Sequence, residues 1–166
     1  NGIEMPYFGL GTYLADNDEE VIDAVKFALE SGYRHLDTAA AYKNEEGVGK
    51  GIVDSGLARE DVFLTTKVWN SDQGFESTLK AFEASVKRLG TDYVDLYLVH
   101  WPVAGKYKDT WRALEKLYKE GRIKAIGVSN FLKHHLEDLL GSAEIVPMVN
   151  QMEFHPHLVQ QELLDF

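Results

Sequence analysis

The sequence of 166 residues contains no cysteine, only four prolines, and fewer basic than acidic side chains. Without cysteine it can form no disulfide, no thiolate metal site and no thiol-based catalytic centre. Its formal net charge of −10 argues against binding to nucleic acid or to an anionic membrane surface. No segment approaches the ~20 apolar residues of a membrane span. The first residues also lack the charged stretch followed by an apolar stretch that is typical of a signal peptide. We therefore expect a cytoplasmic protein with no nucleic-acid or membrane partner.

The composition nevertheless supports a substantial core. Hydrophobic residues make up 45% of the chain and charged residues 27%, a balance typical of a folded protein. A compact domain of roughly 150 residues buries about 68–70% of the surface that its unfolded chain exposes. We therefore predict that residues 1–166 form a single domain.

Segments with helical periodicity alternate along the chain with short apolar segments. Stripes such as Val21, Val25 and Ala28 have the spacing of a helix with one buried face. Glycines 32, 56, 90, 121 and 141 follow such stripes, where a left-handed C-terminal cap favours glycine. The apolar segments predict parallel strands at residues 7–13, 33–38, 62–68, 93–100, 123–129 and 146–154, and a last helix is expected over residues 158–166.

The predicted strands end in polar residues, namely Asp37, Lys67, His100, Ser129 with Asn130, Gln151 and Glu153. Because a closed barrel gathers all the carboxyl ends of its strands at one mouth, this pattern favours a (β/α)8 TIM barrel over an open, doubly wound α/β sheet. Such a barrel needs eight units and typically ~250 residues. We therefore expect the N-terminal portion of a barrel, strands 1–6, with the last two βα units absent and with exposed sheet edges that could associate.

Four side chains near these strand ends suit proton transfer to a carbonyl oxygen: Asp37, Tyr42, Lys67 and His100. An unperturbed tyrosine has a pKa near ~10, and we expect the nearby ammonium of Lys67 to lower the pKa of Tyr42. A carboxylate would keep the lysine charged, and an imidazole could orient a carbonyl or join the proton relay.

No side chain in this set supplies a hydride, so reduction of the carbonyl would require a bound nicotinamide. Ser129, Asn130 and Gln151 offer hydroxyl and amide groups suited to its carboxamide. Trp69 and Trp101 could form the wall of an apolar substrate pocket.

Several motifs in order resemble the aldo-keto reductases over essentially the whole chain. They are Gly32-Tyr33-Arg34-His35-Leu36-Asp37-Thr38-Ala39 with Tyr42, Thr65-Thr66-Lys67-Val68-Trp69, His100-Trp101-Pro102 and Gly127-Val128-Ser129-Asn130-Phe131. The short stretch of residues 102–109 is similar to that of bacterial members described as 2,5-diketo-gluconate or methylglyoxal reductases, with prostaglandin F synthase-like relatives. The resemblance implies a TIM barrel that reduces aldehydes, ketones or dicarbonyls with NADPH, a small carbonyl compound being the substrate, and a full-length protein that is a monomer.

The resemblance also implies a role for each matching residue. Tyr42 would be the general acid, tuned by Lys67 and Asp37, and His100 would orient the substrate. Ser129, Asn130 and Gln151 would hold the nicotinamide carboxamide, beside the first-strand residues Gly11, Thr12 and Tyr13. The family's seventh-strand aromatic and its basic segment after the eighth strand have no counterpart here. We therefore expect weak NADPH binding by this chain and leave NADH open as an alternative.

Other interpretations remain open, some from the resemblance and one, the aldolase, from the residues alone. The chain could be a non-catalytic, cofactor-binding regulatory relative, an inactive truncated form, or a Schiff-base aldolase with Lys67 as nucleophile. No metal is expected, since His134 and His135 suit the start of a surface helix better than a ligand set. Residues 45–49 are interpreted as an acidic helix start and Trp111 as core, while the role of Glu153 stays undecided.

Overall fold

The computed structural model describes all residues from Asn1 to Phe166. Its six strands form one parallel sheet in which each strand pairs with the next along the chain, in the order β1-β2-β3-β4-β5-β6. A doubly wound sheet would reverse this order at a switch point, so the consecutive order confirms the barrel-type winding. The strands are β1 (Leu10–Gly11), β2 (His35–Asp37), β3 (Phe63–Val68), β4 (Val94–Val99), β5 (Ile123–Ser129) and β6 (Asn150–Gln151).

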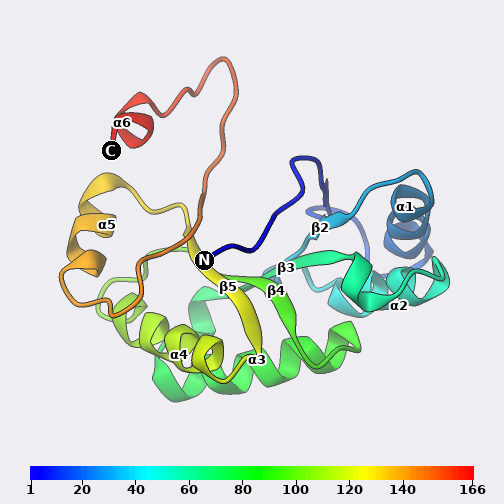
Figure 1. The fold of residues 1–166 in the computed structure, drawn as a ribbon, viewed down its shortest axis with the longest axis horizontal. Coiled ribbons are helices and arrows are strands. Elements are labelled where there is room, and N and C mark those ends of the chain that lie inside the picture. The colour runs from blue at the N-terminus through cyan, green and yellow to red at the C-terminus, as the bar shows by residue number, and fades with distance from the viewer.

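The helices up to residue 140 connect successive strands and lie along the outer side of the sheet, and a last short helix follows the final strand (Figure 1). They are α1 (Glu19–Glu30), α2 (Glu45–Asp54), α3 (Phe75–Leu89), α4 (Tyr107–Lys119), α5 (Lys133–Leu140) and α6 (Gln161–Asp165), with short 3-10 turns η1 (Ala40–Tyr42), η2 (Arg59–Asp61) and η3 (Asn70–Asp72). The sheet is open between β1 and β6. The fold is therefore an open half-barrel, six strands of a TIM-barrel architecture.

Two hydrophobic clusters cover the two faces of the central strands. Tyr97 and Val99 of β4 belong to the larger cluster, between the sheet and the helices. Leu96 and Leu98 of the same strand belong to a smaller cluster on the inner face. Successive side chains of a strand point to opposite faces, so a strand covered on both sides is buried throughout and mostly apolar. This explains why β3 and β4 are buried along their whole length.

Helix α2 approaches its neighbours closely because glycines line its contact faces. A Cβ added at Gly49 would lie 2.4 Å from the carbonyl oxygen of Leu89, and one at Gly47 would lie 2.3 Å from a methyl group of Val21. The acidic start predicted for residues 45–49 is confirmed, since Glu45 and Glu46 occupy the first turn of α2.

Some details of the prediction are wrong. The edge strands β1 and β6 have only two residues each, because each pairs on one side only. Helix α6 begins at Gln161 rather than at residue 158. Gly141 has a φ of −64° and is not a left-handed cap, because the turn after α5 keeps a right-handed backbone. Trp111 is buried as predicted, with 1% of its surface exposed.

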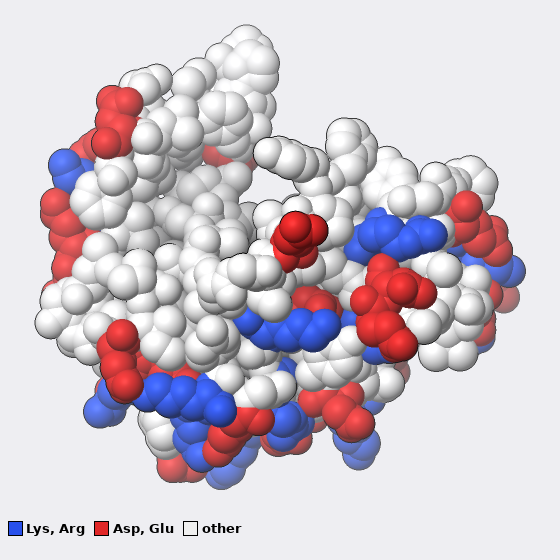
Figure 2. Space-filling view, viewed as in Figure 1, with Lys and Arg blue, Asp and Glu red and all other residues white.

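Charged side chains gather over the outer helices and the lower rim in Figure 2, whereas the region around the opening at the top is mostly uncharged. Several large apolar side chains near the two chain ends are exposed, including Tyr7, Phe8, Phe154 and Leu164. No helix of the structure is long and apolar enough to cross a membrane.

Candidate active site

Lys67 and Asp37 form an ion pair at the carboxyl ends of β3 and β2. Lys67 Nζ lies 2.5 Å from Asp37 Oδ1 and donates a second hydrogen bond, of 2.9 Å, to the carbonyl oxygen of Thr38. The lysine side chain is only 1% exposed. Burial lowers the pKa of Lys67, and the carboxylate of Asp37 opposes this change. A buried ammonium is tolerated here because it is paired and hydrogen-bonded.

Tyr42 ends η1 and lies over this ion pair. The centre of its ring is 5.1 Å from Lys67 Nζ. Burial and, to a smaller extent, the negative charge of Asp37 together raise the pKa of Tyr42 to about 12. The expected lowering by Lys67 is therefore wrong. Asp37 already compensates the ammonium, so the pair offers the tyrosine little net positive charge, while burial disfavours the tyrosinate.

His100 comes directly after β4, and its ring contacts the ring of Tyr42. The two rings meet edge to face with centres 5.8 Å apart, and Trp69 contacts the imidazole in the same way at 5.0 Å. Burial and the charge of Lys67, opposed in part by Asp37, together lower the pKa of His100 to about 4. The imidazole is therefore neutral at neutral pH. Its buried Nδ1 has no hydrogen-bond partner in the structure.

A cavity of about 860 Å³ opens over these residues. Tyr42, His100, Trp69 and Trp101 are among the residues that line it. The remaining lining residues are Tyr13, Ala41, Ser129, Asn130, Gln151, Met152 and Glu153. Asp37 and Lys67 do not line the cavity, so any effect they have on its contents passes through the side chains they contact.

Ser129, Asn130 and Gln151 lie together at the carboxyl ends of β5 and β6. The Asn130 amide donates to the carbonyl oxygen of His100 at 3.0 Å and to Ser129 Oγ at 3.1 Å. The Gln151 amide donates to Asp37 Oδ2 at 2.7 Å, across the mouth of the half-barrel. Both NH2 groups are thus engaged within the protein, which leaves the amide oxygens as acceptors toward the cavity.

Gly11, Thr12 and Tyr13, at the end of the first strand and just after it, do not all lie at the cavity. Tyr13 lines the cavity, and its ring centre is 5.1 Å from that of Tyr42. Thr12 is buried, and its single hydroxyl proton is shared between two acceptors, the carbonyl oxygen of Asp37 at 3.3 Å and Asn44 Oδ1 at 3.4 Å. Gly11 does not line the cavity either. Of these three residues, the structure brings only Tyr13 to the cavity.

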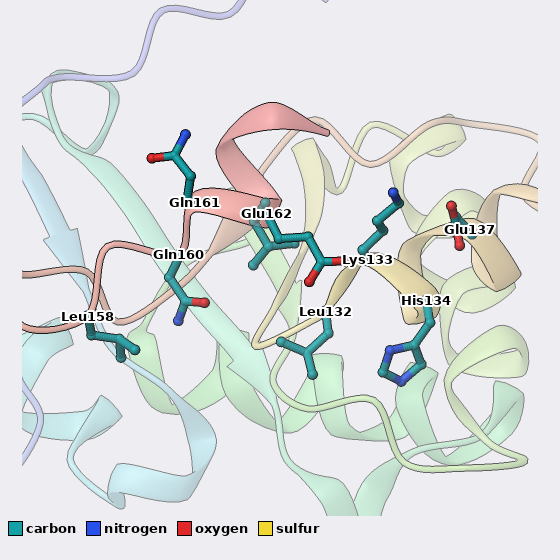
Figure 3. A pocket seen from close by; sticks show the side chains of 9 residues that line it. Leu132, Lys133, His134, Glu137, Leu158, Gln160, Gln161 and Glu162 are labelled. Atoms are coloured by element: carbon teal, nitrogen blue, oxygen red, sulfur yellow. The ribbon is translucent and has the colours of Figure 1, made fainter.

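A second cavity, of about 530 Å³, lies between α5 and α6, away from these residues. Figure 3 shows Lys133 and His134 of α5 on one side of it and Gln161 and Glu162 of α6 on the other. His134 is exposed at the start of α5, as expected for a surface helix. Nothing buried and polar faces this cavity, and it contributes nothing to the site around Tyr42.

Sequence reasoning missed several residues of the site. Ala41 and Met152 line the cavity, and Asn44 is fully buried beside the ion pair. Asn44 stands directly before a helix start, a pattern that indicates an N-cap and so gave no reason to assign it elsewhere. Glu153, left undecided, lies exposed at the rim and is 3.0 Å from His155.

Comparison with known proteins agrees with this geometry. The sequence pattern described as the Aldo/keto reductase family matches residues 8–166. The glyoxal reductase of Bacillus subtilis (strain 168) is 66% identical over 166 residues, which are all of this chain and 60% of that protein. The chain thus belongs to the aldo-keto reductase family, and it spans about 60% of the length of this curated relative.

Solved structures of similar proteins match the fold of this chain. An aldo-keto reductase from a Medee basin deep-sea metagenome library, MGS-M4, superposes with a TM-score of 0.94 and 55% identity, covering 98% of this chain and 60% of that one. A mutant of Gox0644 in complex with NADPH superposes with a TM-score of 0.91 and 49% identity, covering 98% and 59%. The chain is therefore similar to a solved aldo-keto reductase and to a protein whose structure was solved in complex with NADPH.

Proposed function

We propose that the protein reduces small aldehydes, ketones or dicarbonyls with NADPH, with Tyr42 as the general acid. The observation that carries this proposal is the placement of the Tyr42 ring between the buried Lys67–Asp37 pair and the open cavity. Glyoxal and methylglyoxal are the first substrates to test, since the similar Bacillus subtilis protein is described as a glyoxal reductase.

The donor and acceptor groups at the cavity fit a nicotinamide carboxamide. Asn130 Oδ1 and Gln151 Oε1 could accept its two N–H groups, because the NH2 of each side chain is engaged inside the protein. The hydroxyl of Ser129 lies beside them and bonds to the carbonyl oxygen of Gln151. When bound, the cofactor would supply the hydride that no side chain of this chain can provide.

The chain's own residues would move the proton. With a pKa of about 12, Tyr42 keeps its hydroxyl proton at neutral pH and can donate it to a carbonyl oxygen in the cavity. The ammonium of Lys67 lies 5.1 Å from the centre of the ring, but Asp37 compensates most of its charge, so it would offset only a small part of the cost of the tyrosinate left behind. Neutral His100 could orient the carbonyl, and Trp69 and Trp101 would form the apolar wall against which the substrate packs.

Burial of Lys67 speaks against the Schiff-base alternative. A nucleophilic amine must be unprotonated and must reach a carbonyl carbon, whereas Lys67 is 1% exposed and bonded to Asp37. We also propose that the chain supplies the first six βα units of an eight-unit barrel. A cytoplasmic location, a monomeric full-length protein and a preference for NADPH over NADH stay predictions.

The test is NADPH oxidation with methylglyoxal by the parent chain, Tyr42→Phe and Tyr118→Phe. Losing a general acid costs roughly 10²- to 10⁴-fold in rate, so Tyr42→Phe should lose nearly all turnover. Tyr118, on α4, lies outside the cavity, and its variant should keep the parent rate. Undiminished turnover in Tyr42→Phe would contradict the assignment. Cofactor binding without turnover in the parent would favour the non-catalytic relative.

A further inference from the structure

Asn44 occupies the N-cap position of α2 but does not cap the helix. Asparagine is among the residues preferred there because its side-chain oxygen can accept a hydrogen bond from the first turn. The side chain of Asn44 makes no such bond. Instead, Asn17 Oδ1 accepts the backbone N–H of Gly47 at 2.8 Å. A residue from another loop thus takes over part of the capping of α2, and the amide of Asn44 serves elsewhere.

The amide of Asn44 binds the segments that follow β1 and β2. Its Nδ2 donates to the carbonyl oxygens of Thr12 at 2.8 Å and Ala15 at 3.0 Å. Its Oδ1 accepts the hydroxyls of Thr38 at 2.9 Å and Thr12 at 3.4 Å. Asn44 is 0% exposed, so all of its hydrogen-bonding capacity is used inside the protein. Because carbonyl oxygens only accept, these partners allow a single orientation of the amide.

The partners of Asn44 are in turn bound to the Lys67–Asp37 pair. The backbone N–H of Thr12 donates to the carbonyl oxygen of Asp37 at 2.9 Å. The carbonyl oxygen of Thr38 accepts Lys67 Nζ at 2.9 Å. One buried amide therefore connects the backbone around both members of the ion pair.

Tyr42 lies two residues before Asn44, and Lys43 between them has a left-handed φ of 60°. Holding Asn44 therefore also fixes one end of the turn that carries the tyrosine. We propose that Asn44 is a positioning residue, whose amide clamps the segments after β1 and β2 to the start of α2 and so holds Tyr42 over Lys67. We call Asn44 and its partners Thr12, Ala15 and Thr38 the clamp. Its effect on catalysis rests on the proposed function, whereas its effect on how firmly Lys67 is held can be tested without turnover.

The test compares Thr38→Val, which removes one hydroxyl of the clamp, with Thr38→Ser, which keeps it. The measured quantity is the rate at which Lys67 is reductively methylated, monitored by peptide mass spectrometry. A faster rate means that the amine is held less firmly in its buried position. Thr38→Val should methylate about fivefold faster than the parent, the factor of one ordinary net hydrogen bond, and Thr38→Ser should restore protection. In an Asn44→Ala background, Thr38→Val should add nothing, because the bond is already lost.

Thr110→Val is the matched control for a lost buried hydroxyl. Thr110 is 0% exposed, and its Oγ accepts the backbone N–H of Gly74 at 2.8 Å, on helices that do not carry the clamp. Unchanged methylation in Thr38→Val, or equal acceleration in Thr110→Val, would overturn the proposal. For reduction of methylglyoxal, Thr38→Val should lower kcat about fivefold and leave KM unchanged. If the methylation rates change as expected but the parent chain does not reduce methylglyoxal, the positioning role of Asn44 is supported and the proposed function is contradicted.

Discussion

Acid should destabilise the protein through His100, because the folded chain holds this ring neutral. Its pKa is about 4 in the folded state, against 6.5 for an ordinary histidine. Above pH 6.5 neither state binds the proton, so His100 contributes no pH dependence there. Between pH 6.5 and 4 the unfolded chain binds a proton that the folded chain does not. As the pH is lowered from 6.5 to 4, the free energy of unfolding therefore decreases, by about 3 kcal/mol in total at pH 4.

The assay is urea unfolding at several pH values from 7.5 to 4, followed by far-ultraviolet circular dichroism. His100→Gln should show a shallower fall of the unfolding free energy between pH 6.5 and 4, because no buried imidazole remains there to be protonated on unfolding. His134→Gln removes an exposed imidazole instead, keeps His100 and should retain the parent's slope. An equally steep acid dependence in His100→Gln and the parent would refute the reasoning, since the buried ring would then not carry the linkage.

Three further predictions follow from packing, charge burial and the extent of the sheet. Gly49→Ala should destabilise the fold by about 1–3 kcal/mol in urea unfolding, because its Cβ would lie 2.4 Å from the Leu89 carbonyl oxygen, whereas Gly141→Ala, with only ordinary contacts, should be nearly neutral. Asp95→Asn should cost about 3 kcal/mol by the same assay, since this buried carboxylate lies 2.8 Å from Arg59; a loss below about 1 kcal/mol would contradict a structural role. NADPH should bind this chain weakly in a fluorescence titration, because phosphate sites on this fold commonly follow strands 7 and 8; a submicromolar dissociation constant would contradict this.

The sequence alone determined the architecture and most of the candidate site. Alternating helical and apolar segments predicted the six parallel strands, since strands covered on both faces are mostly apolar. The polar residue at the end of each strand predicted where side chains would meet, because parallel strands place their carboxyl ends at one edge. Tyr42, His100, Trp69 and Gln151 were placed at one cavity on this basis, and the structure brings them there.

Only the tertiary structure decided the electrostatics and the supporting contacts. The direction of the Tyr42 pKa shift depends on how closely Asp37 compensates Lys67 and how deeply the ring is buried, neither of which appears in the local sequence. Asn44 reads as an ordinary helix cap, and its actual partners, Thr12 and Thr38, are 32 and 6 residues away. Periodicity reports which face of an element is buried, whereas hydrogen-bond partners and desolvation depend on contacts between elements distant in the chain.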